Sequence, residues 1–296
     1  MQFLVFAITY PIIWLLSLLP MRILYLFSDF LYVIFYYIIR YRKKVVLENL
    51  TLAFPNKGLS ELKSIRKMFF KHFTDLFVES IKAFTITKRT LAKRYKYINP
   101  ELINVLYDKG KSICFVGAHQ ANWEWSISIP IHVRINCFGA YTRIGNSFFD
   151  KAVKDSRMKF GFVGYKTTET VKSITHNIDQ GIQGLYLLLS DQSPQIHKTH
   201  YWREFMGVKV PIHTGAEMIA KKFNMAVVNY SVKKVKRGYF EVTFETITED
   251  PNKFKDYEIT DKYLDITERN IQNQPEYYLW SHKRFKHRDK VPEKWK

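Results

Sequence analysis

The sequence predicts an α/β protein with a mixed central sheet flanked by helices and preceded by N-terminal membrane-anchoring helices. Two observations indicate this fold class. Apolar runs of strand length, such as 113–116 and 184–190, alternate along the chain with amphipathic stretches of helical length. In addition, residues 1–39 carry only two charges, Arg22 and Asp29, which suits a lipid environment.

The apolar N-terminus divides at Pro20 into two stretches of 17 residues, Phe3–Leu19 and Ile23–Ile39. Seventeen helical residues span about 25 Å, slightly less than the hydrocarbon core of about 30 Å. We therefore expect one inserted or re-entrant helix and one helix at the membrane interface. A buried pair of core helices is the alternative interpretation of the same apolar pattern.

Basic residues follow the apolar N-terminus directly, in the run 40–44. By the positive-inside rule, this run predicts that the rest of the chain lies on the cytoplasmic side. The formal net charge of +19 predicts an anionic partner, which could be a membrane surface, a nucleic acid, or an acidic protein or substrate. The sequence thus predicts a membrane anchor with a basic flank over 1–44 and a domain at the cytoplasmic face over 45–296.

Helices are expected before the first strand. A short helix over 45–54 ends before Pro55, which disfavours helical backbone in the residue that precedes it. A longer amphipathic helix is expected to begin with Ser60 as its N-cap and to run to Ile81 with aromatic residues on one face. A third helix, 102–107, precedes Gly110 and leads into the strand 113–116.

The remaining strands are expected at 184–190 and 226–231, both apolar, and at 239–247, where polar and apolar residues alternate. The last of these follows Lys236-Arg237-Gly238 and therefore reads as a hairpin partner of the strand before it. Helices are expected to fill the intervals at 148–160, 168–180, 214–223 and 261–273.

A histidine and a carboxylate lie just after the first strand, in Gly-Ala-His-Gln-Ala-Asn-Trp-Glu (117–124). A histidine base can remove the proton of a hydroxyl group, and a carboxylate behind the imidazole can fix its tautomer. On one continuous helix, His119 and Glu124 would lie about 140° apart and would not meet. They can meet if His119 ends a strand-to-helix loop and Asn122 caps a helix whose first turn holds Glu124. A lone His-x4-Glu also occurs by chance, so the motif alone is a weak signal.

Several other stretches occur in an order that makes the set specific, although each alone is weak. They are 42–55, with Asn-Leu and Phe-Pro elements; 117–124; Tyr141–Asn146; Phe149-Asp150 with Arg157 and Gly161; Leu189–Ser193; Phe205–Gly207 before Val210-Pro211 and Gly215; and Pro275–Lys286. Through them, nearly the whole chain resembles the late acyltransferases of lipid A biosynthesis. These are lauroyl and myristoyl transferases of the lysophospholipid acyltransferase-like superfamily. The chain departs from the family pattern at Met206 and in Ser-Pro-Gln-Ile-His (193–197), which puts the acceptor in question more than the chemistry.

The resemblance implies a glycerolipid acyltransferase-like α/β fold with its active site at the cytoplasmic face of a bacterial inner membrane. It implies acyl transfer from acyl carrier protein, or less often coenzyme A, to a hydroxyl of a membrane lipid precursor. It implies no metal or redox cofactor. Cys114 and Cys137 are the only cysteines, and they form neither zinc-type spacing nor a disulfide framework.

The same comparison suggests roles for individual residues. His119 is expected to be the general base and Glu124 the residue that orients it. Arg143 and Arg157 are candidates for binding anionic substrate groups or the oxyanion, with structural ion pairing as the plainer alternative. Asp191 and Gln192 follow a strand end, where sites of α/β proteins lie. Asp191 is expected either to hold an active-site arginine or to cap the next turn.

Two other functions remain open from the sequence. One is acyl transfer to a different lipid, such as a lysophospholipid, an aminolipid or a glycolipid. The other is a non-catalytic, basic, membrane-bound protein that recruits an acidic partner, for which His119 and Glu124 need not share a pocket. A nucleic-acid binder is disfavoured because the N-terminus is apolar and no recognition module is visible. The high positive charge fits docking of acyl carrier protein, which is acidic, and of phosphorylated lipid headgroups.

Overall fold

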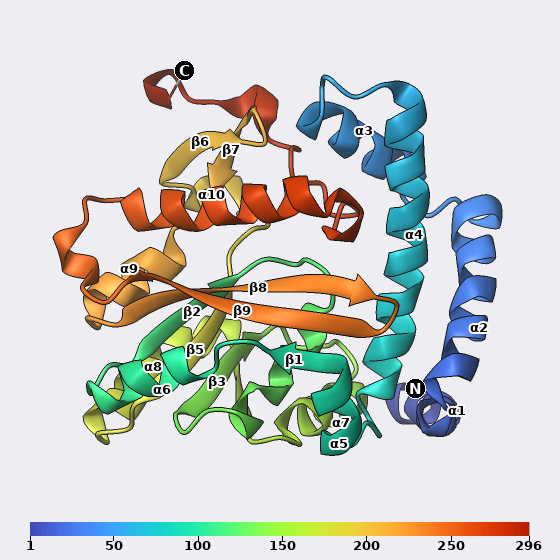
Figure 1. Ribbon diagram of the computed structural model, residues 1–296, viewed down its shortest axis with the longest axis horizontal. Helices are drawn as coiled ribbons and strands as arrows, with labels where there is room; N and C mark the ends of the chain where they lie inside the picture. The colour runs from blue at the N-terminus through green and yellow to red at the C-terminus, as the bar shows by residue number, and fades with distance from the viewer. Residues whose placement is uncertain (296) are drawn as a thin grey trace.

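The computed structural model describes residues 1–295, which form a seven-stranded sheet, a separate two-stranded sheet and the helices around them (Figure 1). The large sheet has the order β1-β9-β8-β2-β5-β3-β4. Its neighbouring strands are parallel except for the antiparallel pair β8 and β9, so the sheet is mixed. This confirms the predicted fold class. The strands are β1 (Tyr95–Tyr97), β2 (Ile113–Gly117), β3 (Asn136–Tyr141), β4 (Phe162–Lys166), β5 (Gly184–Leu189), β6 (Tyr201–Phe205), β7 (Val208–Ile212), β8 (Ala226–Lys236) and β9 (Tyr239–Thr248).

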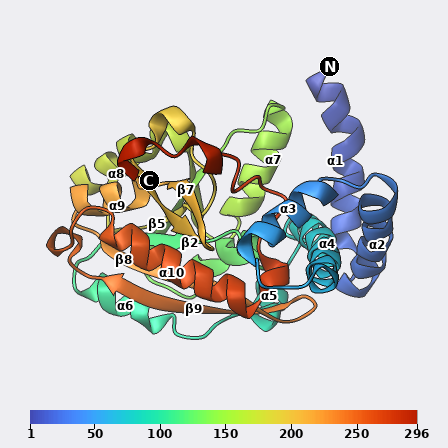
Figure 2. The ribbon, with the colours of Figure 1, turned by 90° about the horizontal axis from the view of Figure 1, so that it is seen from above.

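Helices cover both faces of the large sheet, and a group of N-terminal helices stands beside it (Figures 1 and 2). The α-helices are α1 (Gln2–Leu18), α2 (Met21–Val33), α3 (Lys43–Ala53), α4 (Leu59–Lys82), α5 (Lys88–Arg94), α6 (Glu101–Asp108), α7 (Ser147–Met158), α8 (Thr170–Asp179), α9 (Gly215–Lys222) and α10 (Glu258–Asn273). A π-helical turn, Ile34–Ile38, extends α2, and a 3-10 helix, η2 (Trp123–Ile131), follows β2.

The two faces of the sheet belong to two separate hydrophobic cores, because successive strand residues point to opposite sides. On one face, Cys114 and Val116 pack with residues of α3, α4, α8, α9 and α10. On the other face, Ile113 and Phe115 pack with residues of α5, α6 and η2. We call these the α9 side and the η2 side of the sheet.

Most of the expected elements are present, and several boundaries differ. The hairpin after Lys236-Arg237-Gly238 is confirmed as β8 and β9, although β8 continues five residues beyond the expected end at 231. The helix expected to begin at Ser60 instead has Gly58 as its N-cap. β1, β3 and β4 were not expected, and neither was the small antiparallel sheet of β6 and β7.

Helices α1 and α2 lie on the outer side of α4 (Figure 2). The buried residues of α2 recur at helical spacing and face α4, whereas Ile23, Leu26 and Phe30 on its other side are exposed. α1 is exposed along most of its length, including Phe3 and Ile8. A large exposed apolar surface of this kind marks an interaction site.

By length and composition, residues Met21–Ile38 form a helix that could cross a membrane, and the apolar helix Gln2–Leu18 is shorter. The boundary expected between 1–44 and 45–296 stays a prediction. Contacts cross it, since Ser28 on α2 donates to Asp75 on α4 at 2.8 Å. Arg42 Nη1 likewise donates to the carbonyl of Ser281 at 3.0 Å.

Candidate active site

The register of two neighbouring strands brings His119 and Asp191 together. β2 and β5 are parallel and paired so that Gly117 lies opposite Leu189. Each candidate residue lies two positions beyond that pair, so the two side chains emerge at the same edge of the sheet. The Asp191 carboxylate accepts a hydrogen bond from His119 Nδ1 at 2.6 Å and another from the His119 backbone N–H at 3.1 Å. This pairing leaves Nε2 of His119 free to take a proton.

The pKa shifts of His119 and Asp191 favour a histidine that acts as a base beside an ionised carboxylate. Burial disfavours the imidazolium form of His119, but the charge and hydrogen bond of Asp191 outweigh burial and raise the pKa of His119 above 6.5. Burial alone would raise the pKa of Asp191, whereas His119 and the hydrogen bonds around the carboxylate lower it. Asp191 therefore stays ionised behind the ring although it is fully buried.

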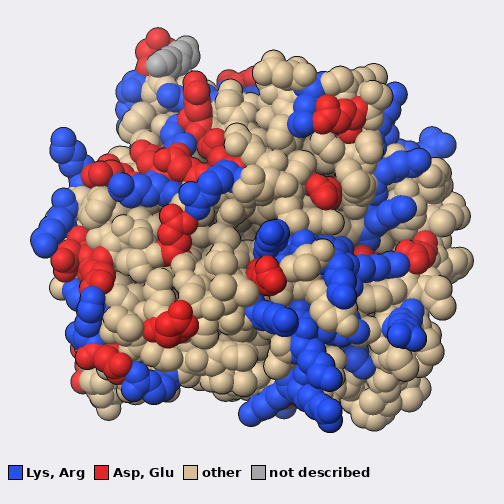
Figure 3. All heavy atoms as spheres, viewed as in Figure 1, with Lys and Arg blue, Asp and Glu red and all other residues tan. Residues whose placement is uncertain are grey.

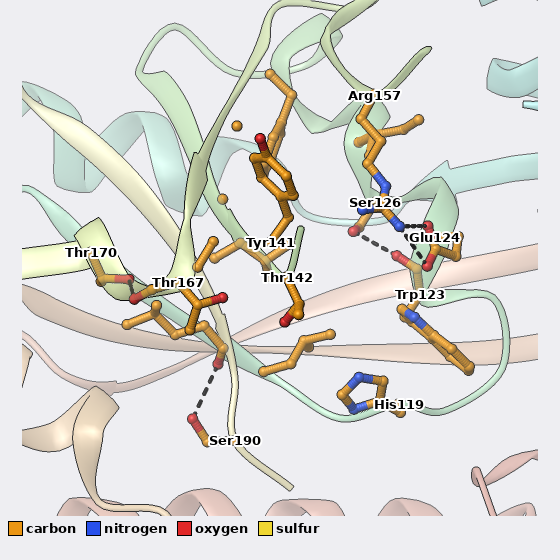
Figure 4. A pocket seen from close by; sticks show the side chains of 18 of the residues that line it. His119, Trp123, Glu124, Ser126, Tyr141, Thr142, Arg157, Thr167, Thr170 and Ser190 are labelled. Atoms are coloured by element: carbon orange, nitrogen blue, oxygen red, sulfur yellow. Dashed lines mark hydrogen bonds and ion pairs between the residues drawn. The ribbon is translucent and has the colours of Figure 1, made fainter. Parts of the chain in front are cut away.

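Glu124 makes a different contact from the one expected. Arg157 Nη2 donates to both oxygens of Glu124, at 2.9 and 3.1 Å (Figure 4). Asn122 does cap the following helix as expected, because its Oδ1 accepts from Trp125 N–H at 3.1 Å, but that helix is η2, a 3-10 helix. Its first turn carries Glu124 toward Arg157 on α7. Asp191, and not Glu124, makes the hydrogen bond to the His119 ring, while the charge of Glu124 makes a smaller contribution that raises the pKa of His119.

The loop between β2 and η2 is held from both sides. Ala121 has a left-handed backbone (φ 50°), its N–H donates to Tyr277 O at 2.8 Å and its carbonyl accepts from His72 Nε2 at 3.2 Å. Asn122 Nδ2 donates to the buried carboxylate of Glu79 at 2.7 Å. Neither His72 nor Glu79 was identified from the sequence, and their positions in an amphipathic helix gave no signal of this contact.

A cavity of about 670 Å³ opens beside His119 at the carboxyl ends of β3, β4 and β5 (Figure 4). Its polar lining includes Glu124 and Arg157, as well as Gln192, which lies there as the sequence suggested. The Trp123 and His119 rings pack edge to face, with their centroids 5.1 Å apart. Arg143 is exposed in the loop before α7. Among the described residues, 1–295, it does not belong to those that line this cavity.

The arrangement can perform base chemistry on a substrate in a partly enclosed space. A histidine that carries its proton on Nδ1, held by a buried carboxylate, presents Nε2 to a hydroxyl group. The cavity has room for a substrate with a long apolar portion, because its lining also includes Ile127, Phe162, Leu187 and Ile219. An ion pair at the mouth, Glu124 with Arg157, adds a polar group for orientation.

One comparison with known proteins assigns a family. A family model described as bacterial lipid A biosynthesis acyltransferase matches residues 2–287 of this chain. The matched segment includes the N-terminal helices, the His119 loop, Asp191 and the whole stretch Pro275–Lys286. No curated protein matches the chain.

Proposed function

The chain belongs to the bacterial lipid A biosynthesis acyltransferase family, and we propose that it transfers a fatty acyl chain from acyl carrier protein, or from acyl coenzyme A, to a hydroxyl of a lipid A precursor. The observation that carries this proposal is the His119–Asp191 pair at 2.6 Å beside a cavity of about 670 Å³. The pair supplies a base, and the cavity supplies space for a lipid-like substrate. No metal or redox cofactor takes part in the proposed reaction.

In the proposed reaction, Nε2 of His119 removes the proton of the acceptor hydroxyl as its oxygen attacks the thioester carbonyl. The C–S bond breaks, an ester bond forms, and the imidazolium returns the proton to the leaving thiolate. Asp191 stabilises the imidazolium and keeps Nε2 directed toward the substrate. Arg157 and Gln192 at the cavity bind polar or anionic groups of the substrates, and Arg143 offers a further cationic group in the loop before α7.

We further propose that α1 and α2 hold the protein at the cytoplasmic face of the bacterial inner membrane. Their exposed apolar surfaces, with Phe3, Leu26 and Phe30 among them, suit the acyl region of a bilayer. The basic run 40–44 follows directly and would contact anionic headgroups. This placement would give the catalytic cavity access to a membrane-embedded acceptor.

Replacing His119 by alanine tests the proposed function. We expect loss of the base to lower the acyl-transfer rate by about 10²–10⁴. The measurement is lipid mass spectrometry of cells that lack the gene, complemented with the native protein or the variant at equal expression, together with the transfer rate of the purified proteins. One acyl chain should be missing from one membrane lipid and return with the native protein alone.

Other results of that experiment select the alternatives. A missing chain on a lysophospholipid, an aminolipid or a glycolipid would keep the enzyme and change its acceptor. Full restoration by the His119→Ala variant would contradict catalysis at this site and favour a basic membrane-bound protein that recruits a partner. Equal lipid profiles with and without the gene would contradict acyl transfer altogether.

The pH dependence of the rate is a second expected result. Since His119 must be neutral to act as a base and its pKa is raised, the rate should increase through a limb centred above pH 6.5. Glu124→Gln removes one charge that raises this pKa, so its limb should lie at lower pH. The measurement is kcat/KM against pH for both proteins; a native limb below pH 6.5 would contradict the assignment. Glu79, whose pKa burial raises to about 7, is the group to control for, with Glu79→Gln expected to retain the limb.

The salt dependence of kcat/KM should differ between an acidic acyl carrier protein donor and an uncharged donor. Lys and Arg side chains gather over α5 and the turn between β8 and β9 (Figure 3), and the formal net charge is +19. We propose that this charge attracts acidic acyl carrier protein, so high salt should lower kcat/KM with that donor by about tenfold or more. An uncharged acyl-pantetheine donor is the control and should change little. Equal salt sensitivity of both donors would contradict electrostatic docking.

A further inference from the structure

The cavity beside His119 has a wall on each side of the sheet. Ile127, Phe162 and Leu187 line it on the η2 side, while Leu188 and Ile219 line it on the α9 side. These two walls could each receive an apolar chain, and they differ in composition. Hydroxyl groups of Thr167, Thr170 and Ser190 also line the cavity, and Ser126 adds a hydroxyl group from η2.

The η2-side wall ends on the ring of Phe162. Phe162 lies opposite Cys137 in the register of β3 and β4, and Lys166 at the end of β4 lies opposite Tyr141. The Phe162 backbone is therefore four residues below the carboxyl edge of the sheet, but its ring reaches back to Gly139, which lies only two residues below Tyr141. At 3.3 Å per residue, the ring is about 7 Å below that edge. Only 5% of the residue is exposed, so the ring closes the cavity toward the core.

Gly139 is what allows the ring to occupy this place. A Cβ atom at position 139 would lie 2.3 Å from Cε1 of Phe162, which is far inside contact distance. The ring thus extends across the bare backbone of β3, and the space above it is lined by Ile127 and Leu187. Shortening the side chain at 162 would extend the cavity over Gly139, toward the core.

We propose that Phe162 is the floor of the site for the transferred acyl chain and sets its length. This inference rests on the proposed acyl transfer and goes beyond it by naming the wall and the residue. The acyl carbonyl would lie at His119, and the chain would extend down the η2 side because Ile127, Phe162 and Leu187 make that wall largely apolar, with Ser126 as its polar member. Three bonds of an extended chain span about 3.8 Å, so a depth of about 7 Å takes about five carbons below the edge of the sheet, in addition to those between the edge and His119.

The test is the donor preference of the purified full-length protein in detergent. Saturated acyl donors from octanoyl to stearoyl are compared by kcat/KM with one acceptor, for the native protein, Phe162→Leu, Phe162→Ala and Leu187→Phe. Burying one more methylene of the acyl chain contributes about 0.8 kcal/mol, which changes kcat/KM by about fourfold. Both Phe162 variants should therefore favour longer donors, with a ratio change of about 15-fold for two added carbons in the alanine variant. Leu187→Phe should favour shorter ones.

Ile219→Ala is the matched control on the α9 side and should change the rate for all donors in the same proportion. A shift of preference in this variant, with none in Phe162→Leu, would overturn the proposal and move the chain to the α9 side. Phe162→Leu retains an apolar side chain, so the answer does not depend on folding of the alanine variant. If the native protein transfers no acyl chain, that result would instead contradict the proposed acyl transfer, and with it the role proposed for Phe162.

Discussion

Asp191→Asn should lower the acyl-transfer rate by about 10⁴, the largest loss expected from a change that preserves shape. The Asp191 carboxylate accepts two hydrogen bonds, from the His119 backbone N–H and from its ring Nδ1. Asparagine has one acceptor oxygen. If that oxygen accepts from the backbone, the amide NH₂ faces Nδ1 and drives the ring proton to Nε2, where it blocks proton abstraction.

The matched comparison is Glu124→Gln, the other carboxylate of the site. Glu124 binds Arg157 rather than His119, so its loss removes a charge-assisted contact at the mouth and leaves the base oriented. We expect a decrease of about 10- to 100-fold, the equivalent of one hydrogen bond to a charged group. Single-turnover rates of both variants at saturating donor provide the measurement. A larger loss from Glu124→Gln would mean that Glu124 replaces Asp191 as the partner of His119 in the reacting state.

The contrast between these carboxylates shows where local sequence is informative and where it is not. Asn122 was recognisable as a cap because its hydrogen bond is made within its own turn. The partner of His119 lies 72 residues away and depends on the pairing of β2 with β5, which no local pattern encodes. One signal was present: His119 and Asp191 each follow the last apolar residue of a strand at a similar distance.

The strands that were not expected also have a physical explanation. β3 and β4 are five to six residues long and each contains a glycine, Gly139 and Gly164, which lowers strand propensity. Those two residues lie opposite each other in the register, so both strands lack a side chain at the same level. The strands at 113–116 and 184–190 were found because unbroken apolar runs reflect burial on both faces.

A cluster of buried charged groups on α4 was also outside the reach of sequence patterns. Asp75 accepts from Arg237 Nε and Nη2, at 2.9 and 2.6 Å, and from Ser28 at 2.8 Å, and lies 3.4 Å from Lys234 Nζ. Lys234 in turn donates to His72 Nδ1 at 3.2 Å, and His72 holds the loop that follows His119. The cluster therefore joins α2, α4 and β8 behind the loop that follows His119.

Asp75→Ala should lower the free energy of unfolding by about 3–5 kcal/mol, because it leaves Lys234 buried without its carboxylate partner. The melting temperature should decrease by about 6–20 °C, at roughly 2–4 °C per kcal/mol. Thermal unfolding of the full-length protein in detergent is the measurement. The control is Asp108→Ala, which breaks the exposed pair with Arg134 and should cost less than about 1 kcal/mol.

A second substitution distinguishes a charge effect from lost packing. Adding Lys234→Met to Asp75→Ala removes the uncompensated buried ammonium and leaves Arg237 with Asp29, to which it donates at 2.7 Å. Much of the lost stability should return in the double variant, since removing both charges of a buried pair is often nearly neutral. If Asp75→Ala costs no more than the Asp108 control, the cluster contributes little to stability. If the double variant is no more stable than Asp75→Ala, the loss comes from packing around α4 rather than from the unpaired charge.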